Sequence, residues 1–515
     1  MTSGPLRAGR ASARTAQAVG TDVEPWNRKD LAISSTSPAV ASGTFPAGFG
    51  WGTATASYQI EGAVQADGRS PSIWDTFSHT PGMITDGTDG DRANDHYHRW
   101  ADDVDLMGRL GTGFYRFSLA WPRLQPDGRG DLHRAGLDFY ARLVDRLLER
   151  GITPWVTLYH WDLPQVLEDA GGWPNRDVAS RFADYSRQVF DALGDRIDYW
   201  TTLNEPFCSG LLGYAAGEHA PGRHEPVSAI HAVHHLLLGH GLAVQAMRDR
   251  ARPDQQFGIT LNLSPYAAAT DSAADIDAAR RMDGVGNRLF LDPVLRGRYP
   301  ADVVEDLASL MSFDHVRDGD LKLISGPIDA LGINYYTRHV VRAGTGHRFH
   351  HTAYVGSGDV EIVSTGAPRT ARGWEITPDG LYEVLTHVSR SYDAPPLWIT
   401  ENGAACDDKV SADGKVHDPE RIAYLDAHFR AALRAIADGV NLRGYFVWTL
   451  MDNFEWAYGE SSRFGLVHVD FETQARTLKD SAAWYASVIA ANGLSADSYA
   501  ARTSAPTSSG TTFSS

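Results

Sequence analysis

The sequence predicts an α/β fold: a (β/α)8 TIM barrel, built as a single domain with long loops over its C-terminal face. Short apolar segments alternate with longer amphipathic segments along nearly the whole chain, which is the pattern of repeated βα units. Eight such apolar segments can be distinguished. Polar and aromatic residues follow directly after most of them, and in a parallel barrel these positions share the face on which sites are built.

Each predicted strand is a short run of apolar and β-favouring residues. The eight strands are expected at residues 48–54, 113–119, 153–159, 199–203, 257–263, 330–333, 397–400 and 444–449. Amphipathic helical patterns between them cover residues 135–150, 177–193, 228–250, 378–392 and 419–438. No Gly-x-Gly-x-x-Gly follows the first strand and no Walker loop occurs, so the sequence does not indicate a nucleotide-binding α/β fold. Long loops at residues 63–92, 340–372 and 454–464 are expected to cover the C-terminal face.

Both ends of the chain differ in composition from the predicted barrel. Residues 1–44 scatter Arg, Ala, Ser and Thr without the apolar core of a secretion signal, and we expect a disordered N-terminal extension. The barrel domain is expected at residues 45–490, and the Ser/Thr/Ala-rich residues 491–515 are expected to form a disordered C-terminal tail. No apolar run approaches the roughly 18 residues of a membrane span. The sequence therefore predicts a cytoplasmic protein.

Charge and composition narrow the classes of partner. The chain has 515 residues, of which 22% are charged and 43% hydrophobic, and its formal net charge is -17. An acidic surface argues against nucleic acid or an anionic membrane as partner, because both attract basic proteins. It also disfavours a polyanionic substrate. A homo-oligomer is left open.

Cysteines and histidines do not suggest a disulfide framework or a metal centre. The chain has 2 cysteines, Cys208 and Cys406, which are expected to be buried free thiols. Four histidines lie on one helical pattern, but no carboxylate or cysteine ligand clusters with them, so packing is the better explanation. These are His231, His234, His235 and His240. No metal and no cofactor are expected.

Two segments share one design that points to chemistry. In residues 398–403 (WITENG) an apolar strand runs into Glu401 and is stopped by Asn-Gly, and in residues 200–206 (WTTLNEP) a similar strand runs into Glu205 and Pro. Each strand therefore delivers a glutamate to its C-terminal end. A pair of carboxyl groups is what cleavage of a glycosidic bond requires.

The other strand ends carry the residue types of a sugar-binding site. Amides, carboxylates and histidine can bind sugar hydroxyl groups, and an indole can stack on the C–H face of a pyranose. A phosphate site would instead show glycine-rich turns and several basic residues. The residues delivered at or beyond the strand ends include Gln59, Arg116, His160, Trp161, Asn204, Asn334, Tyr336, Trp448, Glu455 and Trp456.

At these residues the chain resembles glycoside hydrolase family 1, the group of retaining β-glucosidases and β-galactosidases. Seven motifs occur in the family's order and cover everything except the two tails. They are residues 49–62 (FGWGTATASYQIEG), 115–123 (YRFSLAWPR), 159–164 (YHWDLP), 202–206 (TLNEP), 334–336 (NYY), 399–403 (ITENG) and 452–456 (DNFEW). The resemblance implies a retaining exo-β-glycosidase, and specifically a β-glucosidase that hydrolyses terminal non-reducing β-D-glucosyl residues through a covalent glycosyl-enzyme intermediate. The expected substrate is a β-glucoside or short β-linked oligosaccharide, with β-galactosides, β-fucosides and transglycosylation left open.

The resemblance also implies roles for single residues. Glu401 is expected to be the nucleophile and Glu205 the acid/base, with carboxyl groups roughly 5 to 5.5 Å apart as retention requires. Arg116, Asn334 and Tyr336 are expected to support them. The implied sugar-binding residues are Gln59, His160, Trp161, Asn204, Trp448, Glu455 and Trp456, while Trp374 and Phe464 are implied in the walls of the site.

Differences between this chain and other members of the family indicate which substrates are expected. Phospho-glycosidases of the family carry Ser in place of Glu455, and then Lys and Tyr where this chain has Ser462 and Phe464. A 6-phosphorylated sugar is therefore not expected to fit. Phe207 stands where Trp is expected, which leaves the aglycone preference open. The rival from another class, a sugar-binding protein on an inactive barrel, is disfavoured because such relatives lose one of the glutamates and this chain keeps both.

Overall fold

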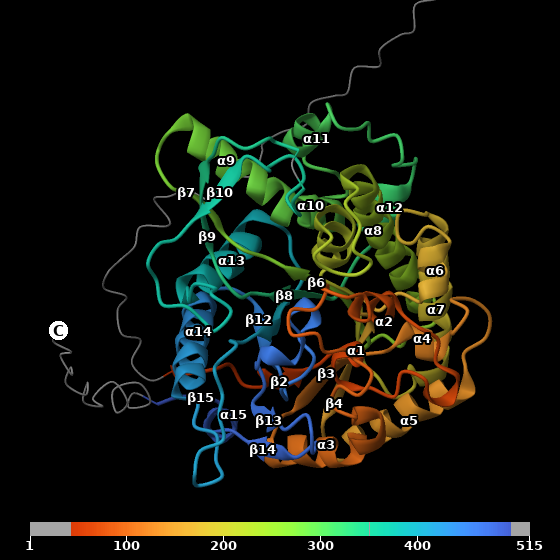
Figure 1. Ribbon diagram of the computed structural model, residues 1–515, viewed down its shortest axis with the longest axis vertical. Helices are drawn as coiled ribbons and strands as arrows, with labels where there is room; N and C mark the ends of the chain where they lie inside the picture. Colours follow the sequence, from red (N-terminus) through yellow and green to blue (C-terminus); the bar gives the residue numbers. More distant parts are fainter. Residues whose placement is uncertain (1–42, 350, 496–515) are drawn as a thin grey trace, which may run out of the picture.

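The structure is a computed structural model, and it describes residues 43–349 and 351–495. Its centre is a closed barrel of parallel strands in the order β11-β12-β2-β3-β4-β5-β6-β8 (Figure 1). This confirms the predicted fold, and every predicted strand overlaps an observed one. The barrel strands are β2 (Gly50–Ala54), β3 (Phe114–Ser118), β4 (Thr153–Tyr159), β5 (Tyr199–Asn204), β6 (Gln256–Asn262), β8 (Ala330–Asn334), β11 (Leu397–Asn402) and β12 (Leu442–Trp448).

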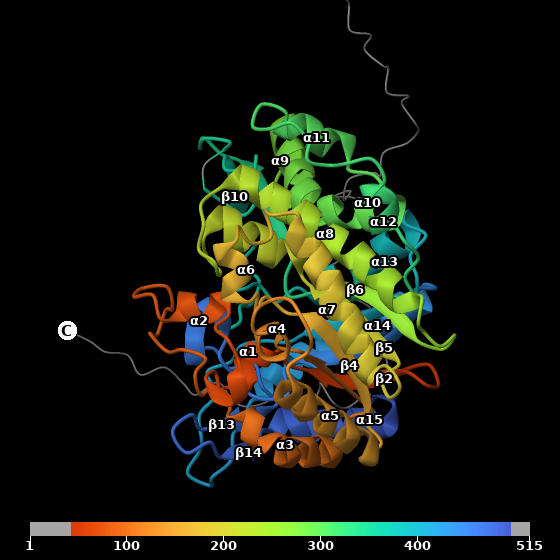
Figure 2. The ribbon, with the colours of Figure 1, turned by 90° about the vertical axis from the view of Figure 1, so that its right-hand side faces the viewer.

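Helices surround the barrel, as the second view shows (Figure 2). Those expected from the sequence appear as α5 (Arg134–Glu149), α7 (Asp177–Leu193), α8 (Pro226–Arg248), α13 (Pro378–Ser391) and α14 (Pro419–Ala437). The longer helices that the sequence analysis did not delimit are α3 (His96–Leu110), α9 (Ala273–Asp283), α10 (Leu289–Arg296) and α15 (Asp480–Ala491). Shorter ones are α1 (Ser57–Ile60), α2 (Ile73–Ser78), α4 (Trp121–Leu124), α6 (Gln165–Asp169), α11 (Ala301–Leu307), α12 (Asp320–Ile324) and the π-helices η2 (Cys208–Ala216) and η3 (Gly284–Arg288).

Most of the outer helices are amphipathic, and α5 is typical. Its buried side chains include Phe139, Leu143, Val144 and Leu147, which recur at a spacing of three to four residues and face the barrel. Helix α8 differs because it is apolar on nearly all sides. Its length and mean hydropathy of 1.3 meet the criteria for a membrane span, but 78% of its most apolar stretch is buried inside the protein. It is the helix of a protein core.

An aromatic cluster fills the end of the barrel opposite the site. The Trp155 ring lies 4.9 Å from that of Trp398 and 5.3 Å from that of Phe446. Glycines at Gly50 and Gly444 make room for the indole, because a Cβ built at Gly444 would stand 2.3 Å from the Trp398 ring. Close packing of this kind leaves the barrel interior solid, so that the pocket begins only at the carboxyl ends of the strands.

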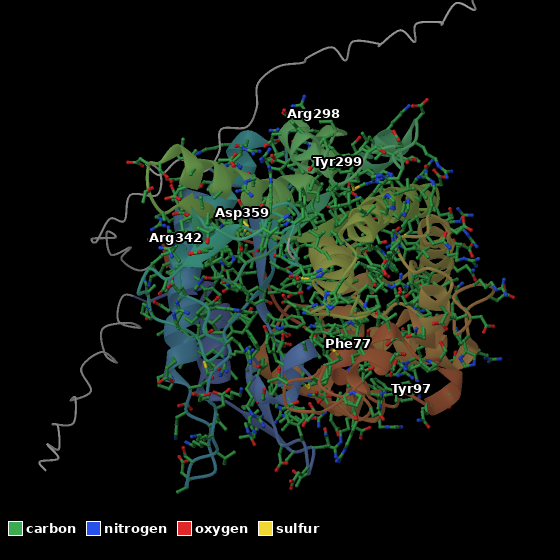
Figure 3. All side chains as sticks on the ribbon, turned by 45° about the horizontal axis from the view of Figure 1, so that its top comes forward. Phe77, Tyr97, Arg298, Tyr299, Arg342 and Asp359 are labelled. Atoms are coloured by element: carbon green, nitrogen blue, oxygen red, sulfur yellow. The ribbon has the colours of Figure 1, made fainter. Side chains whose placement is uncertain are left out.

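A small second sheet extends one side of the site. It consists of β7 (Tyr266–Ala268), β9 (His339–Ala343) and β10 (Val360–Val363), in the order β10-β9-β7. An ion pair ties it to α9, since Arg281 Nη1 lies 2.7 Å from Asp359 Oδ1. Arg342 on β9 and Asp359 beside β10 lie close together on this face of the molecule (Figure 3). A further hairpin, β13 (Val467–Val469) with β14 (Arg476–Leu478), follows the last barrel strand.

Described structure extends a few residues beyond both predicted bounds of the barrel domain, 45 and 490. Strand β1 (Gly43–Thr44) pairs in antiparallel fashion with β15 (Gly493–Leu494), so residues assigned to the two disordered tails form a small sheet together. Asn492 closes this junction by accepting a hydrogen bond from Trp51 Nε1 at 2.9 Å. Because β1 and β15 lie near opposite ends of the described residues, no local sequence pattern predicts that they pair. The rest of the two predicted tails, residues 1–42 and 496–515, lies outside the described residues.

Candidate active site

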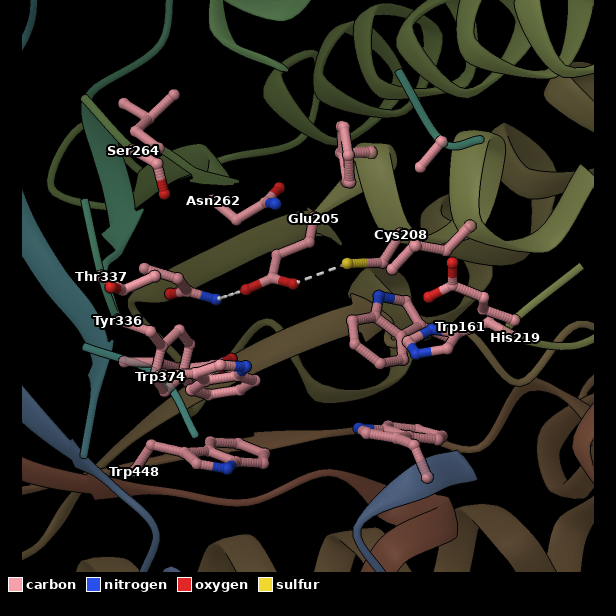
Figure 4. Close-up of a pocket in the computed structure, with 18 of the residues that line it drawn as sticks. Trp161, Glu205, Cys208, His219, Asn262, Ser264, Tyr336, Thr337, Trp374 and Trp448 are labelled. Atoms are coloured by element: carbon pink, nitrogen blue, oxygen red, sulfur yellow. Dashed lines mark hydrogen bonds between the residues drawn. The ribbon is translucent and has the colours of Figure 1, made fainter. Parts of the chain in front are cut away.

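A cavity of about 320 Å³ opens at the carboxyl ends of the barrel strands (Figure 4). It is lined by aromatic and polar side chains together, as a site for a polyhydroxylated ring would be. Eleven of the residues singled out from the sequence line it: His160, Trp161, Glu205, Asn334, Tyr336, Trp374, Glu401, Trp448, Glu455, Trp456 and Phe464. The other three, Gln59, Arg116 and Asn204, are buried directly behind this wall.

Glu401 lies within β11, near its carboxyl end, and is held by two donors. Arg116 Nη1 lies 2.7 Å from its Oε1, and the Tyr336 hydroxyl donates to its Oε2 at 2.8 Å. Burial raises the pKa of Glu401 above its ordinary value, while Arg116 and Tyr336 oppose this shift. Burial and the negative charge of Glu401 raise the pKa of Tyr336 well above its usual range, so the phenol remains a donor.

Glu205 follows β5 and is held by an amide and a thiol instead of a cation. Asn334 Nδ2 donates to its Oε1 at 2.6 Å, and Cys208 Sγ lies 3.0 Å from its Oε2. Burial, together with the charge of Glu401, raises the pKa of Glu205 to about 7. Because Glu401 is paired with a guanidinium and Glu205 is not, Glu401 is the first of the two to lose its proton.

Behind the wall, a hydrogen-bonded network links the two glutamates. Arg116 Nη2 donates to Asn204 Oδ1 at 2.6 Å, and Asn334 Nδ2 lies 3.1 Å from the same oxygen. Asn204 Nδ2 lies 3.0 Å from His160 Nε2. Burial and the neighbouring Arg116 lower the pKa of His160 well below its ordinary value, so the imidazole is neutral. The network fixes side chains from β3, β5 and β8, and from the residue that follows β4, relative to one another.

The loop after β12 closes another side of the site with Glu455 and Trp456. Gln59 Nε2 donates to Glu455 Oε2 at 3.3 Å, and burial with the charge of Glu401 raises the pKa of Glu455 to about 8. The Trp456 ring lies 4.4 Å from that of Trp161, and the Trp448 ring lies 5.9 Å from that of His160. Indole faces and polar groups therefore alternate around the cavity.

Three of these residues have left-handed backbone conformations. Their φ angles are 78° at Trp161, 45° at Glu205 and 53° at Trp456. Such conformations are rare outside glycine and cost on the order of 1 to 3 kcal/mol each. They occur where each strand or loop must turn sharply to aim a side chain into the cavity.

Several residues of the site were not predicted from the sequence. The cavity is also lined by Cys208, Leu212, Glu218, His219, Ser264, Tyr266, Thr337, His339, Tyr354 and Tyr458. Most lie in loops or in the small sheet, where no strand-end pattern marks them.

One further cation was also missed. Arg372 stacks on the Tyr458 ring at 3.3 Å and donates to Ser462 Oγ at 3.1 Å, and its charge partly opposes the rise in the pKa of nearby Glu455. Arg372 comes from the loop between β10 and α13, far away in sequence.

A cluster of ionisable groups also lies outside the cavity. Ligand-type atoms of His79, Asp89 and Asp91 lie within 4.8 Å of one another, with His79 Nε2 3.3 Å from Asp91 Oδ2. Side chains at this position are 40 to 49% exposed. We interpret the cluster as a surface ion-pair group, because exposed acidic groups commonly gather without a metal.

Comparisons with known proteins decide the family. The sequence pattern of Glycosyl hydrolase family 1 matches residues 41–494. The chain belongs to glycosyl hydrolase family 1. It is similar to the bifunctional beta-D-glucosidase/beta-D-fucosidase of Bifidobacterium breve, with 50% identity over 458 residues that cover 87% of this chain and 98% of the relative.

Solved structures of family 1 enzymes have the same fold. The psychrophilic beta-glucosidase of Micrococcus antarcticus superimposes with a TM-score of 0.84 at 50% identity, covering 87% of this chain and 98% of that one. The beta-glucosidase of Thermotoga maritima in complex with deoxynojirimycin gives 0.83 at 48% identity, covering 88% and 99%. The resemblance inferred from the seven motifs and the predicted barrel are both confirmed.

Proposed function

We propose that this family 1 chain hydrolyses terminal β-D-glucosyl residues by double displacement, with Glu401 as nucleophile and Glu205 as acid/base. The activity predicted from the sequence agrees with the β-glucosidase names of the relatives. The assignment of residues is supported by one observation above all. Of the two strand-end carboxyl groups that line the cavity, Glu205 and Glu401, only Glu401 is paired with a cation.

This asymmetry divides the two roles. The first step needs an ionised nucleophile and a protonated acid at the same pH. Arg116 and Tyr336 favour the carboxylate form of Glu401, whose charge in turn helps to keep the proton on Glu205. Glu401 then attacks the anomeric carbon while Glu205 gives its proton to the glycosidic oxygen. The aglycone leaves as an alcohol, and the sugar remains as an ester of Glu401.

Formation of the ester prepares the second step. Once Glu401 is esterified, the negative charge that raised the pKa of Glu205 is gone, and Glu205 ionises more easily. It can then take a proton from a water molecule that attacks the anomeric carbon. Two inversions leave the sugar in its original β configuration.

The surrounding polar groups suit a neutral sugar. Gln59 Oε1 and His160 Nδ1 are buried and make no hydrogen bond with the described residues, which costs about 1 to 3 kcal/mol for each such group. Sugar hydroxyl groups would satisfy them. Trp448 and Trp456 offer faces for stacking, and Trp374 extends the aromatic wall towards the cavity mouth. Glu455 would repel a phosphate, so we expect non-phosphorylated β-glucosides or short β-linked oligosaccharides even though Arg372 lies nearby.

We further propose that the enzyme works in the cytoplasm on short glucosides such as the products of cellulose breakdown. The small cavity and the two free thiols, Cys208 and Cys406, support this. Long polysaccharide chains would not fit a cavity of about 320 Å³ except by one end, which is consistent with an exo mode of attack.

Azide rescue of two variants tests the assignment. Glu401→Gly should abolish hydrolysis of an aryl β-glucoside, and azide should restore turnover by attacking from the vacated face to give the α-glucosyl azide. Glu205→Ala should slow the reaction by about 10² to 10⁴-fold with poor leaving groups, and azide should then give the β-glucosyl azide. Persistent hydrolysis by Glu401→Gly, or the same azide anomer from both variants, would show that the roles are assigned wrongly.

A further inference from the structure

Cys208 is a buried thiol of the cavity wall that the reaction described above does not use. It is 6% exposed and is the first residue of η2, three positions after Glu205. The chain turns back on itself here, because Cys208 N donates to the Glu205 carbonyl oxygen at 2.9 Å. This turn brings Cys208 Sγ to 3.0 Å from Glu205 Oε2, the contact marked in Figure 4.

The two carboxyl oxygens of Glu205 have different surroundings. Thr400 Oγ1 donates to Asn334 Oδ1 at 2.7 Å, which turns the Asn334 amide so that its Nδ2 faces Glu205 Oε1 at 2.6 Å. Both oxygens accept a hydrogen bond, but the amide N–H on Oε1 is a much stronger donor than the thiol on Oε2. A proton on Glu205 therefore gives up less at Oε2 than at Oε1. Oε2 is the oxygen that Cys208 contacts.

The thiol is suited to an oxygen that must gain and lose a proton. Burial, and secondly the charge of Glu205, raise the pKa of Cys208 well above that of an ordinary thiol, so the group remains S–H and can donate. Sulfur is a weak donor and a weak acceptor. It can stabilise the carboxylate form of Glu205 and still release the O–H of the protonated form to a glycosidic oxygen.

We propose that Cys208 is a positioning residue for catalysis, whose thiol orients Glu205 Oε2 towards the substrate and favours the carboxylate form that must take a proton from water. The proposal rests on the proposed role of Glu205 as acid/base. The Cys208 thiol is a second donor beside the Asn334 amide, so that each carboxyl oxygen of Glu205 has its own hydrogen-bond partner.

The proposal predicts a change in pH dependence with a definite sign. A donor to the ionised form lowers a carboxyl pKa, so removing the thiol raises the pKa of Glu205 above its present value of about 7. The basic limb of the pH profile of kcat/KM reports loss of the proton from the acid. This limb should move to higher pH by about 0.5 to 1 unit, the size expected for a weak donor to a charged group.

The experiment compares four variants of the full chain over the pH range. Cys208→Ala and Cys208→Val both remove the donor, and valine retains most of the volume. Cys208→Ser keeps a donor. Cys406→Ser is the matched control, because Cys406 is the other cysteine and lies outside the cavity wall. The readout is kcat/KM for an aryl β-glucoside with a poor leaving group, with thermal melting of each variant to confirm folding.

We expect the basic limb of Cys208→Ala and Cys208→Val to shift upwards, while Cys208→Ser and Cys406→Ser stay within about 0.2 unit of the unmodified chain. Superimposable profiles for the Ala, Val and unmodified proteins would overturn the proposal. So would equal shifts in Ala, Val and Ser, or a uniform loss of rate at every pH, because either result indicates packing alone. The azide products of the Glu401 and Glu205 variants are independent of this outcome, so failure here is distinct from failure of the proposed function.

Discussion

Replacing Tyr336 by phenylalanine removes one of the two groups that hold Glu401 in its ionised form. The ring and its packing against Trp374 and Phe464 remain, with ring centroids 5.4 and 6.3 Å away, and only the hydroxyl is lost. Because that hydroxyl donates to Glu401 Oε2 at 2.8 Å, its loss destabilises the carboxylate and raises the pKa of Glu401.

The size of the effect follows from the contact. A hydrogen bond to a charged group contributes about 1.5 to 3 kcal/mol, and one pKa unit corresponds to about 1.4 kcal/mol. The pKa of Glu401 should therefore rise by about 1 to 2 units in Tyr336→Phe. Arg116 still pairs with the other oxygen, so the proposed nucleophile can still ionise, but at higher pH. The acidic limb of kcat/KM should move upwards by the same amount and approach the basic limb set by Glu205 at about 7.

The assay is kcat/KM for an aryl β-glucoside between about pH 4 and pH 9. Tyr335→Phe is the matched control, since the neighbouring hydroxyl donates to the Thr377 carbonyl oxygen at 2.6 Å and lies in the protein core. The control should lower thermal stability and leave both limbs in place. An acidic limb in Tyr336→Phe that coincides with that of the unmodified protein, or one that moves equally in Tyr335→Phe, would refute the reasoning.

Two further predictions concern the barrel core and the cavity mouth. Gly444→Ala should lower the free energy of unfolding by about 1 to 3 kcal/mol, because the added Cβ would stand 2.3 Å from the Trp398 ring. The control is Gly108→Ala in α3, where the added Cβ meets open space. This variant should raise the melting temperature, because alanine favours a helix more than glycine does. An unchanged melting temperature in Gly444→Ala would show that the indole moves aside freely. Trp374→Ala should raise KM for aryl glucosides by about 2- to 12-fold, the value of one aromatic contact, with little change in kcat. Trp100→Ala, on the barrel exterior, should leave KM unchanged, and equal effects in the two Trp variants would contradict a role for Trp374 in the site.

Much of the site could be inferred from residue order because of how a parallel barrel is built. Local periodicity marks each strand, and the residue after its last apolar position lies on the same face as the corresponding residues of the other strands. Glu205 and Glu401 are about 200 positions apart in the chain, yet each sits at the end of a recognisable strand. The seven motifs placed the same residues in one family, and the comparisons confirmed that family.

Contacts between loops could not be inferred in this way, because a loop's path depends on what it packs against. Arg372 and Tyr458 meet although nothing in either segment predicts the other, and Gly43 pairs with Leu494 across the chain. Cys208 could be found in the sequence only as a free thiol near a glutamate. That its sulfur lies 3.0 Å from Glu205 Oε2 results from the turn after β5, where a left-handed φ at Glu205 reverses the chain. Strand patterns thus specify which groups reach the site, whereas tertiary packing sets their contacts, and those contacts set the pKa values on which the reaction depends.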